Sequence, residues 1–170
     1  MSLRLRARPI LAALLFVTGC AQQPVGPDGS TQVPEPALQP SQEQALAGEA
    51  AMHAMAQVGS PYRYGGTSPA GFDCSGLVRY SYGLAGLDLP RETREQRKLA
   101  APIDREAELR PGDLLFFRRG RNGTLHVGLY VGHGEFVHAP SSGGQVRVER
   151  FDAPHWKKRF IEARRIAPAT

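Results

Sequence analysis

The sequence predicts an α+β domain in which N-terminal helices pack on one face of an antiparallel sheet of five to six strands. Apolar residues recur at helical spacing in the first half of the domain, over residues 41–58 and again from residue 74. After Pro111-Gly112-Asp113 the pattern changes to short runs of β-branched and aromatic residues bounded by turn residues, which is typical of strands. Helices followed by a run of strands favour this class of domain.

Residues 1–20 have the pattern of a secretory signal peptide. A basic start precedes an apolar run, Ile10 to Val17, that is too short to span a bilayer. Val17-Thr18-Gly19-Cys20 resembles a bacterial lipobox, in which cleavage before the cysteine leaves Cys20 to carry acyl chains such as palmitate. The alternative is a plain signal peptide that happens to end in Gly-Cys.

The residues after Cys20 bear on where the chain is expected to reside. Gln22, and not Asp, follows Ala21, and by the resemblance to lipoproteins this favours outer-membrane over inner-membrane sorting. We therefore expect an outer-membrane lipoprotein facing the periplasm of a Gram-negative bacterium. Residues 21–40 are rich in Pro, Gln and Gly, so we expect a disordered tether there.

Residues 41–170 have the length of one ordinary domain. The formal net charge of +5 falls to +2 once the three arginines of the signal are removed, so no strong bias towards polyanions remains. Basic clusters at 118–121 and 157–165 do not alternate with aromatic residues as a nucleic-acid stacking surface would. We expect no nucleic-acid partner, and solvated faces at both clusters.

The elements of the domain follow in order. Ser41 opens a capping-box pattern with Gln44, and the helical pattern runs to Val58, before Gly59 and Pro61. A second helix is expected from Cys74. The strands expected after it are Leu114 to Phe117, Thr124 to Val131, Glu135 to Ala139, Gln145 to Phe151 and Arg159 to Ile166.

Cys74 is the first candidate for chemistry. The chain has two cysteines, and an acylated Cys20 cannot pair with Cys74, which leaves a free thiol in an oxidising compartment. Cys74 opens a helix, with Asp73 positioned as its N-cap. A thiol attacks as its thiolate, and a helix N-terminus and a neighbouring histidinium both favour ionisation. Cys74 is therefore a candidate nucleophile with His126 as its base.

The strand that carries His126 predicts a third member of the site. His126, Gly128 and Tyr130 share one face, and the glycine leaves room for a partner of the histidine. An odd-length connection around His133, such as a three-residue loop with a glycine bulge, would put His138 on the same face. His138 would then orient the imidazole of His126. A two-residue loop would put the two rings on opposite faces.

Each of these residues has a simpler explanation when taken alone. An inward cysteine is usually a small core residue, His126 would be a satisfied sheet histidine, and His138 a surface residue. Zinc ligation by the same three side chains is a rival, but the chain contains no H-E-x-x-H, H-x-x-E-H or H-x-H, and we expect no metal or other cofactor. The G-x-S-x-G of serine hydrolases is also absent.

A series of motifs, in this order, resembles the NlpC family of bacterial cell-wall cysteine endopeptidases. The resemblance covers nearly all of residues 57–166 and is closest to the small Gram-negative lipoprotein members. The motifs are Tyr62-Arg63-Tyr64-Gly65-Gly66, Phe72-Asp73-Cys74-Ser75-Gly76-Leu77-Val78, Leu89-Pro90-Arg91, Arg110-Pro111-Gly112-Asp113-Leu114-Leu115-Phe116-Phe117, and His126-Val127-Gly128-Leu129-Tyr130-Val131 through Phe136-Val137-His138-Ala139.

The resemblance implies a papain-like fold and a role for each candidate residue. It implies that Cys74 attacks, that His126 acts as base and then acid, and that His138 orients His126. It also implies that the hydroxyl of Tyr62 helps the backbone N–H of Cys74 to hold the oxyanion.

The resemblance further implies substrate contacts beside the nucleophile. The residues concerned are Asp73, Ser75 and Arg63, and helix capping is the alternative role for Asp73.

Members of this family hydrolyse amide bonds in peptidoglycan stem peptides or cross-links, next to D-glutamate, D-alanine or diaminopimelate. The resemblance therefore implies a peptidoglycan endopeptidase with a Cys/His/His thiol mechanism. We expect a monomer with two partners, namely peptidoglycan and the membrane that holds the lipid anchor. The alternative is a non-catalytic murein-binding or scaffolding lipoprotein of the same fold.

Overall fold

The computed structural model of the chain describes residues 40–119, 123–142 and 144–166. The predicted signal peptide, the lipid attachment at Cys20 and the predicted tether up to residue 39 lie outside the described residues. The elements in chain order are α1 (Pro40–Met55), β1 (Thr67–Ser68), β2 (Gly71–Phe72), α2 (Cys74–Leu84), α3 (Thr93–Leu99), β3 (Ala101–Ile103), a 3-10 turn (Glu106–Glu108), β4 (Leu114–Arg119), β5 (Thr124–Gly132), β6 (Glu135–His138), β7 (Arg147–Arg150), α4 (Pro154–Lys157) and β8 (Phe160–Arg165).

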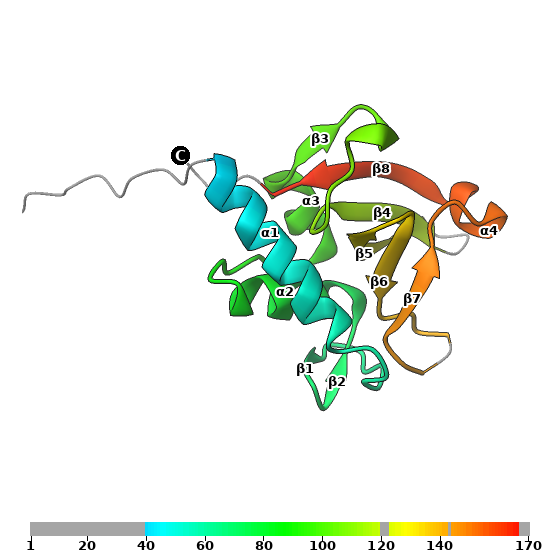
Figure 1. Ribbon diagram of the computed structural model, residues 1–170. Helices are drawn as coiled ribbons and strands as arrows, with labels where there is room; N and C mark the ends of the chain where they lie inside the picture. Colours follow the sequence, from blue (N-terminus) through cyan, green and yellow to red (C-terminus); the bar gives the residue numbers. More distant parts are fainter. Residues whose placement is uncertain (1–39, 120–122, 143, 167–170) are drawn as a thin grey trace, which may run out of the picture. The chain divides into compact units, whose positions relative to one another are not determined.

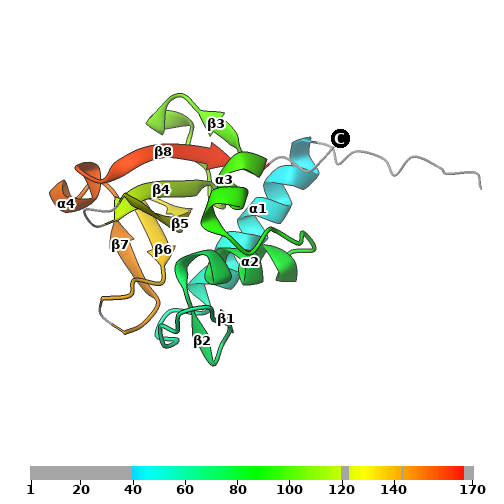
Figure 2. The ribbon, with the colours of Figure 1, turned by 180° about the vertical axis from the view of Figure 1, so that it is seen from behind.

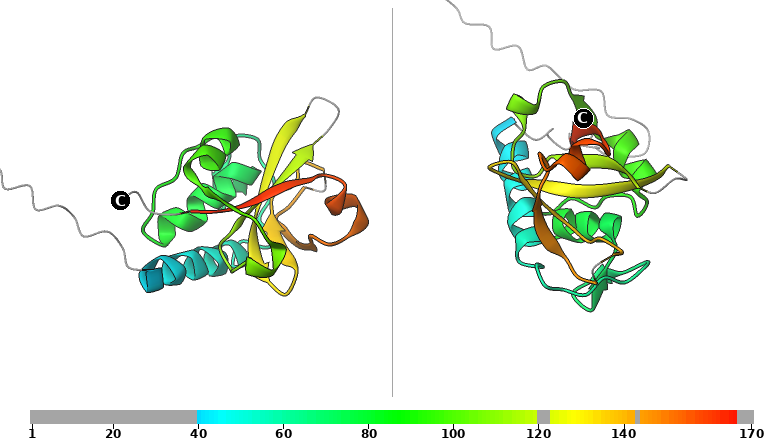
Figure 3. Two further views of the ribbon diagram at one scale, coloured as in Figure 1. Left: turned by 90° about the horizontal axis from the view of Figure 1, so that it is seen from above. Right: turned by 90° about the vertical axis from the view of Figure 1, so that its right-hand side faces the viewer.

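A six-stranded antiparallel sheet organises the described domain, with strand order β3-β8-β4-β5-β6-β7. Helices α1, α2 and α3 lie on one side of it and α4 lies on the other, as Figure 1, the reverse view in Figure 2 and the views in Figure 3 show. β1 and β2 form a separate two-stranded sheet just before α2. The α+β class, with helices on one face of an antiparallel sheet of five to six strands, is confirmed.

Both faces of the sheet are buried, because each is covered by a different layer. Leu114 and Phe116 of β4 belong to the cluster that packs under the helices, together with Leu77 and Val78 of α2. The alternate residues of β4 point to the other side, into a cluster with Trp156 of α4. The helical side positions the start of α2, and the aromatic side houses the histidines of β5 and β6.

Several element boundaries differ from the predictions. α1 begins at Pro40, one residue before the predicted start, so Ser41 lies inside the helix. The predicted strand 145–151 is shorter as β7, and β4 extends to Arg119. α3, β3 and α4 were not predicted, since they are short and their residues lack a clear apolar period. None of the helices described is long and apolar enough to cross a membrane.

The turn between β5 and β6 decides which way the second histidine points. The turn itself has two residues, His133 and Gly134, both with positive φ, and Gly132 pairs with Glu135 across it. A two-residue turn alone would have separated the two histidines. The register then shifts between Tyr130 and Gly132. This bulge adds one residue to β5, so His126 and His138 point to the same face of the sheet.

Candidate active site

The start of α2 is held by its N-cap, Asp73. The Asp73 carboxylate accepts a hydrogen bond from the backbone N–H of Gly76 at 2.8 Å through Oδ1 and from that of Gly65 at 2.9 Å through Oδ2. Asp73 therefore performs the capping role, and it places Cys74 at the first position of the helix. The backbone N–H of a residue at this position has no partner within the helix.

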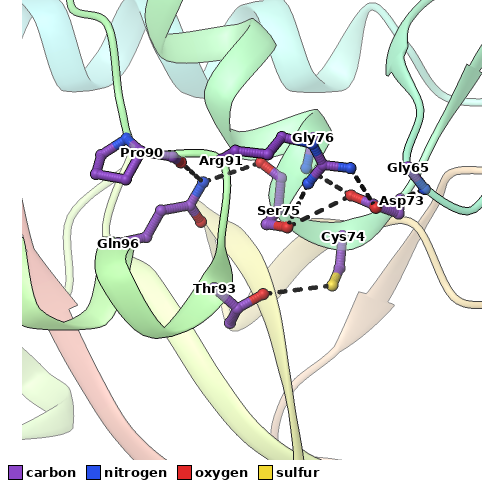
Figure 4. Close-up of polar contacts among 9 residues, drawn as sticks. All are labelled: Gly65, Asp73, Cys74, Ser75, Gly76, Pro90, Arg91, Thr93 and Gln96. Carbon is purple, nitrogen blue, oxygen red and sulfur yellow. Dashed lines mark hydrogen bonds and ion pairs between the residues drawn. The ribbon is translucent and has the colours of Figure 1, made fainter.

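A polar network surrounds the cap and fixes the residue after the nucleophile (Figure 4). The guanidinium of Arg91 pairs with Asp73 and donates from Nη1 to Ser75 Oγ at 2.9 Å. The side-chain amide of Gln96 in α3 donates to the backbone carbonyls of Ser75 and Pro90, at 2.9 Å each. Arg91 and Gln96 were not assigned a role from the sequence, although Arg91 stands in a quoted motif, because only the fold brings them to Asp73 and Ser75.

The Cys74 thiol is half-buried and is a free cysteine. Its Sγ lies 3.8 Å from Oγ1 of Thr93. Burial raises the pKa of the Cys74 thiol, and hydrogen bonds from the backbone N–H of Val127 and from Thr93 lower it by less. Desolvation by burial therefore favours the neutral thiol in the free protein, against the ionisation that a helix N-terminus was expected to favour.

His126 and His138 meet directly. Nε2 of His126 lies 2.8 Å from Nδ1 of His138, and the rings are nearly perpendicular. His126 is 3% exposed and His138 is fully buried. Desolvation lowers the pKa of His126 to about 3, with help from the positive charges of Arg119 and Arg159, and lowers that of His138 to about 4. Both imidazoles are therefore neutral at neutral pH.

Gly128 allows the packing around the contact between His126 and His138. It lies between His126 and Tyr130 on the same face of β5, and a Cβ at this position would come within 2.5 Å of the Phe136 ring. A larger residue would force Phe136 aside, and Phe136 packs against the His138 ring. The glycine therefore preserves the packing on which the two rings rest.

One ring nitrogen of His126 is left over. Nδ1 of His126 is buried and has no hydrogen-bond partner among the described residues. The Cys74 thiol accepts a hydrogen bond from the backbone N–H of Val127, the residue next to His126, so Cys74 lies beside β5. No hydrogen bond joins the thiol to His126 in the described part of the chain. The structure thus joins His126 to His138 and leaves Nδ1 without a partner at the end of β5 that Cys74 approaches.

Trp156 of α4 covers the two histidines, although no sequence pattern predicted a role for it. Its ring stacks on His126 with centroids 5.8 Å apart and an interplanar angle of 19°, and it meets His138 edge-on at 5.0 Å. The indole N–H donates to Glu149. A lone Trp after a proline carries no sequence signal for this position, because α4 reaches the histidines only once the sheet has formed.

A cleft of about 510 Å³ opens over Cys74. Tyr62, Asp73 and Ser75 line it as predicted neighbours of the nucleophile. Arg63 is not among its described lining residues; the backbone N–H of Arg63 donates to the carbonyl of Phe72. His126 lines an adjoining hollow of about 120 Å³, and Arg119 borders both.

The described residues contain no cluster of three or more His, Cys, Asp or Glu side chains arranged to hold a metal ion. A free cysteine at a helix start in a cleft, and a buried histidine pair that begins on the neighbouring strand β5, are the component parts of a papain-like thiol site.

Residues 59–165 match the NlpC/P60 family, so the chain belongs to the NlpC/P60 family. The chain is 46% identical over 117 residues to murein DD-endopeptidase MepH of Escherichia coli, and this match covers 66% of this chain and 43% of MepH. It is 47% identical over 111 residues to the probable endopeptidase NlpC of the same organism, covering 64% of this chain and 70% of the relative.

A solved structure gives the same result for the fold. The peptidoglycan hydrolase RipB of Mycobacterium tuberculosis superposes with a TM-score of 0.64 at 30% identity, over 78% of this chain and 70% of that one. The papain-like fold expected from the resemblance is confirmed. The chain spans about half the length of the first relatives it matches, 43% of MepH and 56% of the murein DD-endopeptidase MepS of Escherichia coli.

Proposed function

We propose that this chain is a peptidoglycan endopeptidase that hydrolyses amide bonds in murein stem peptides or cross-links through Cys74, His126 and His138. The observation that carries the proposal is the pairing of Nε2 of His126 with His138, which leaves Nδ1 as the free nitrogen on the strand beside the Cys74 thiol. Relatives that are named murein endopeptidases support the substrate class.

The chemistry starts from two neutral groups. The pKa of the Cys74 thiol is raised and that of His126 is lowered to about 3, so the resting pair is thiol and imidazole. On substrate binding, Nδ1 of His126 takes the thiol proton, and the sulfur attacks the amide carbonyl carbon. The imidazolium then gives that proton to the leaving amine, and a thioester forms on Cys74.

The second half of the reaction reverses these roles. A water molecule loses a proton to Nδ1 of His126 and attacks the thioester carbonyl. The acid is released, and Cys74 recovers its proton from the imidazolium. His138 keeps the ring of His126 in place through both halves, since Nε2 stays bonded to it.

The oxyanion formed in each half needs fixed donors. The backbone N–H of Cys74, at the first position of α2, has no intrahelical partner and sits at the positive end of the helix dipole. Tyr62 lines the same cleft, and we assign its hydroxyl as the second donor. Such donors are typically worth about 3 to 4 kcal/mol of the barrier.

The bond that is cut is proposed as one next to D-alanine, D-glutamate or diaminopimelate. A cross-link between D-alanine and diaminopimelate is favoured, because MepH and MepS are named DD-endopeptidases. Digestion of purified muropeptides by the protein, followed by mass analysis of the products, distinguishes these bonds. Activity that persists undiminished in Cys74→Ala would refute the mechanism.

The same experiment tests the alternative of a non-catalytic murein-binding protein. The raised pKa of the thiol and the lack of a described hydrogen bond between Cys74 and His126 are what favour this alternative. A protein that sediments with purified sacculi and releases no fragment from any muropeptide would establish the binding role.

We also propose the membrane anchor on Cys20, monomeric behaviour and an outer-membrane location in a Gram-negative cell. The lipobox resemblance supports the anchor, and the Gln22 signal supports the outer-membrane location. Palmitate labelling that is lost in Cys20→Ser, with release of the protein from the outer-membrane fraction, is the expected result. Labelling that survives the substitution, or fractionation with the inner membrane, contradicts it.

A further inference from the structure

Glu149 of β7 lies beside the buried histidine pair and has no role in the mechanism above. Its Oε1 is 3.6 Å from Nε2 of His138, and this Nε2 is buried with no hydrogen-bond partner in the described part of the chain. β6 and β7 pair His138 with Arg147, which places Glu149 on the same face two residues on. A separation of 3.6 Å exceeds hydrogen-bond range, so the contact acts through charge.

The carboxylate is held in this place by other groups. The Trp156 indole N–H donates to Oε2, and Nε of Arg147 donates to Oε1 at 2.5 Å. Burial by itself would raise the pKa of Glu149, but these hydrogen bonds and the nearby His138 lower it below its ordinary value. Glu149 is therefore an anion at neutral pH, and it cannot swing away without leaving the indole N–H without its acceptor.

The two histidines share one proton along the 2.8 Å contact, and the sharing has two forms. In the first, Nε2 of His126 donates to Nδ1 of His138, so Nδ1 of His126 is bare and Nε2 of His138 carries a hydrogen. In the second, Nδ1 of His138 donates, so Nδ1 of His126 carries a hydrogen and Nε2 of His138 presents a lone pair. The second form turns that lone pair towards the carboxylate of Glu149, while the first turns an N–H towards it.

The charged groups around the pair come from every neighbouring element. His138 faces Glu149, Arg147 and His155, and His126 faces His138, Glu149, Arg119 and Arg159. Among them Glu149 is the one anion, and it lies nearest to the far nitrogen of His138. The arginines disfavour a proton on either ring, but they do not choose between its two nitrogens.

We propose that Glu149 is a positioning residue that selects the first form, so that Nδ1 of His126 is kept bare as the base for Cys74. This inference rests on the proposed function for its consequence in catalysis, but the tautomer it names belongs to the free protein. The negative charge acts through His138 on a ring it does not touch.

Nitrogen-15 NMR of the full chain tests this, because long-range imidazole correlations separate the two tautomers of each histidine. In the unsubstituted protein at neutral pH we expect both His126 and His138 with hydrogen on Nε2 and a bare Nδ1. In Glu149→Gln the amide oxygen accepts from Trp156 and the NH₂ group faces Nε2 of His138, so the tautomers shift to Nδ1–H. Glu149→Asp keeps the charge, and we expect it to retain the original tautomers in part.

The matched control is Glu162→Gln. Glu162 of β8 has a side-chain exposure of 23%, against 19% for Glu149, and it is likewise paired with arginines, Arg97 and Arg164. In Glu162→Gln we expect the tautomers of His126 and His138 to match those of the unsubstituted protein.

On muropeptides, Glu149→Gln is expected to lower kcat by about tenfold with little change in KM, by comparison with other carboxylates that orient a functional histidine.

The outcomes separate the inference from the proposed function. Hydrogen on Nδ1 of His126 in the unsubstituted protein, or tautomers unchanged in Glu149→Gln, overturns the role of Glu149 whether or not the protein cleaves muropeptides. If the tautomers shift as expected but the unsubstituted protein cleaves nothing, Glu149 sets the tautomer and the proposed function fails. A tautomer shift together with a kcat equal to that of Glu162→Gln also contradicts the positioning role.

Discussion

The two halves of the site have opposite surroundings. Cys74 stands at the helical side of the sheet, in an open cleft bordered by a polar network of Asp73, Ser75 and Arg91. His126 and His138 stand on the aromatic side, under Trp156 and with almost no exposure. The polar network fixes the backbone around Cys74, and the aromatic packing fixes the ring of His126.

The two sides of the sheet share one property, which is that both keep their ionisable side chain in the neutral form. Burial favours the neutral form on both sides: it raises the pKa of the Cys74 thiol and lowers that of His126 to about 3. The free protein therefore holds a neutral thiol and a neutral imidazole, and under the proposed mechanism the proton moves between them only after substrate binds.

Of the substitutions on the two sides of the sheet, removal of the Cys74 thiol is expected to have the largest effect on muropeptide cleavage. Cys74→Ala leaves the polar network and the histidine pair intact, but it removes the only proposed nucleophile. We expect muropeptide cleavage to fall by roughly 10⁴-fold or more, with an unchanged melting temperature. Cleavage within tenfold of the unsubstituted protein would show that another group attacks.

The next effect comes from the aromatic side. His138→Ala removes the partner of Nε2 of His126, and we expect kcat to fall by about 10²- to 10³-fold because the imidazole loses its fixed orientation. His138→Asn, which keeps a polar group, should recover part of the loss. His133→Asn in the turn of the same hairpin is the control, since His133 is exposed and Asn tolerates its positive φ of 54°. Equal activity of His138→Ala and this control would remove His138 from the site.

A smaller effect, on stability, is expected from the polar side. Asp73→Ala removes the cap of α2 and leaves Arg91 without its anion, so the free energy of unfolding should fall by about 1 to 2 kcal/mol in urea titrations. Asp88→Ala removes an exposed ion pair with Arg79 and should cost less than about 0.5 kcal/mol. If the two variants are equally stable, the network around Asp73 does not hold the helix start.

The buried histidines also make the stability of the protein depend on pH. The pKa values of His126 and His138 are lowered to about 3 and about 4, whereas in the unfolded chain both histidines take up protons near pH 6.5. Below pH 6.5 the unfolded chain therefore binds more protons, so stability present at neutral pH is lost as the pH falls towards 4. Each proton contributes roughly 1.4 kcal/mol per pH unit in that window.

Urea unfolding at pH 7 and pH 5 measures this slope. We expect His138→Asn to be less sensitive to acid than the unsubstituted protein, and His53→Gln on α1 to be equally sensitive. An acid sensitivity that His138→Asn leaves unchanged would mean that this histidine is not buried in the neutral form.

Local patterns were enough for part of the site. Asp73 before an apolar helical pattern predicted the cap and the place of Cys74, because capping involves residues within one turn. The alternation of β5 predicted the common face of His126, Gly128 and Tyr130 for the same reason. His138 was placed correctly on that face, although the connection proved to be a two-residue turn with a bulge.

Other parts were decided only by the tertiary structure. Arg91, Trp156 and Glu149 reach the site from segments 17 to 82 residues away from Cys74 along the chain, and nothing in their local sequence marks a partner. The pKa directions belong to this group, because desolvation depends on which layers close over a side chain. Hydrophobic period and helix capping, which are local, were enough to predict the α+β order, the helix start at Cys74 and the shared face of the histidines. Packing of α4 and β7 on the aromatic side decided the neutral resting state and the charge beside His138, because only the closed sheet brings these groups together.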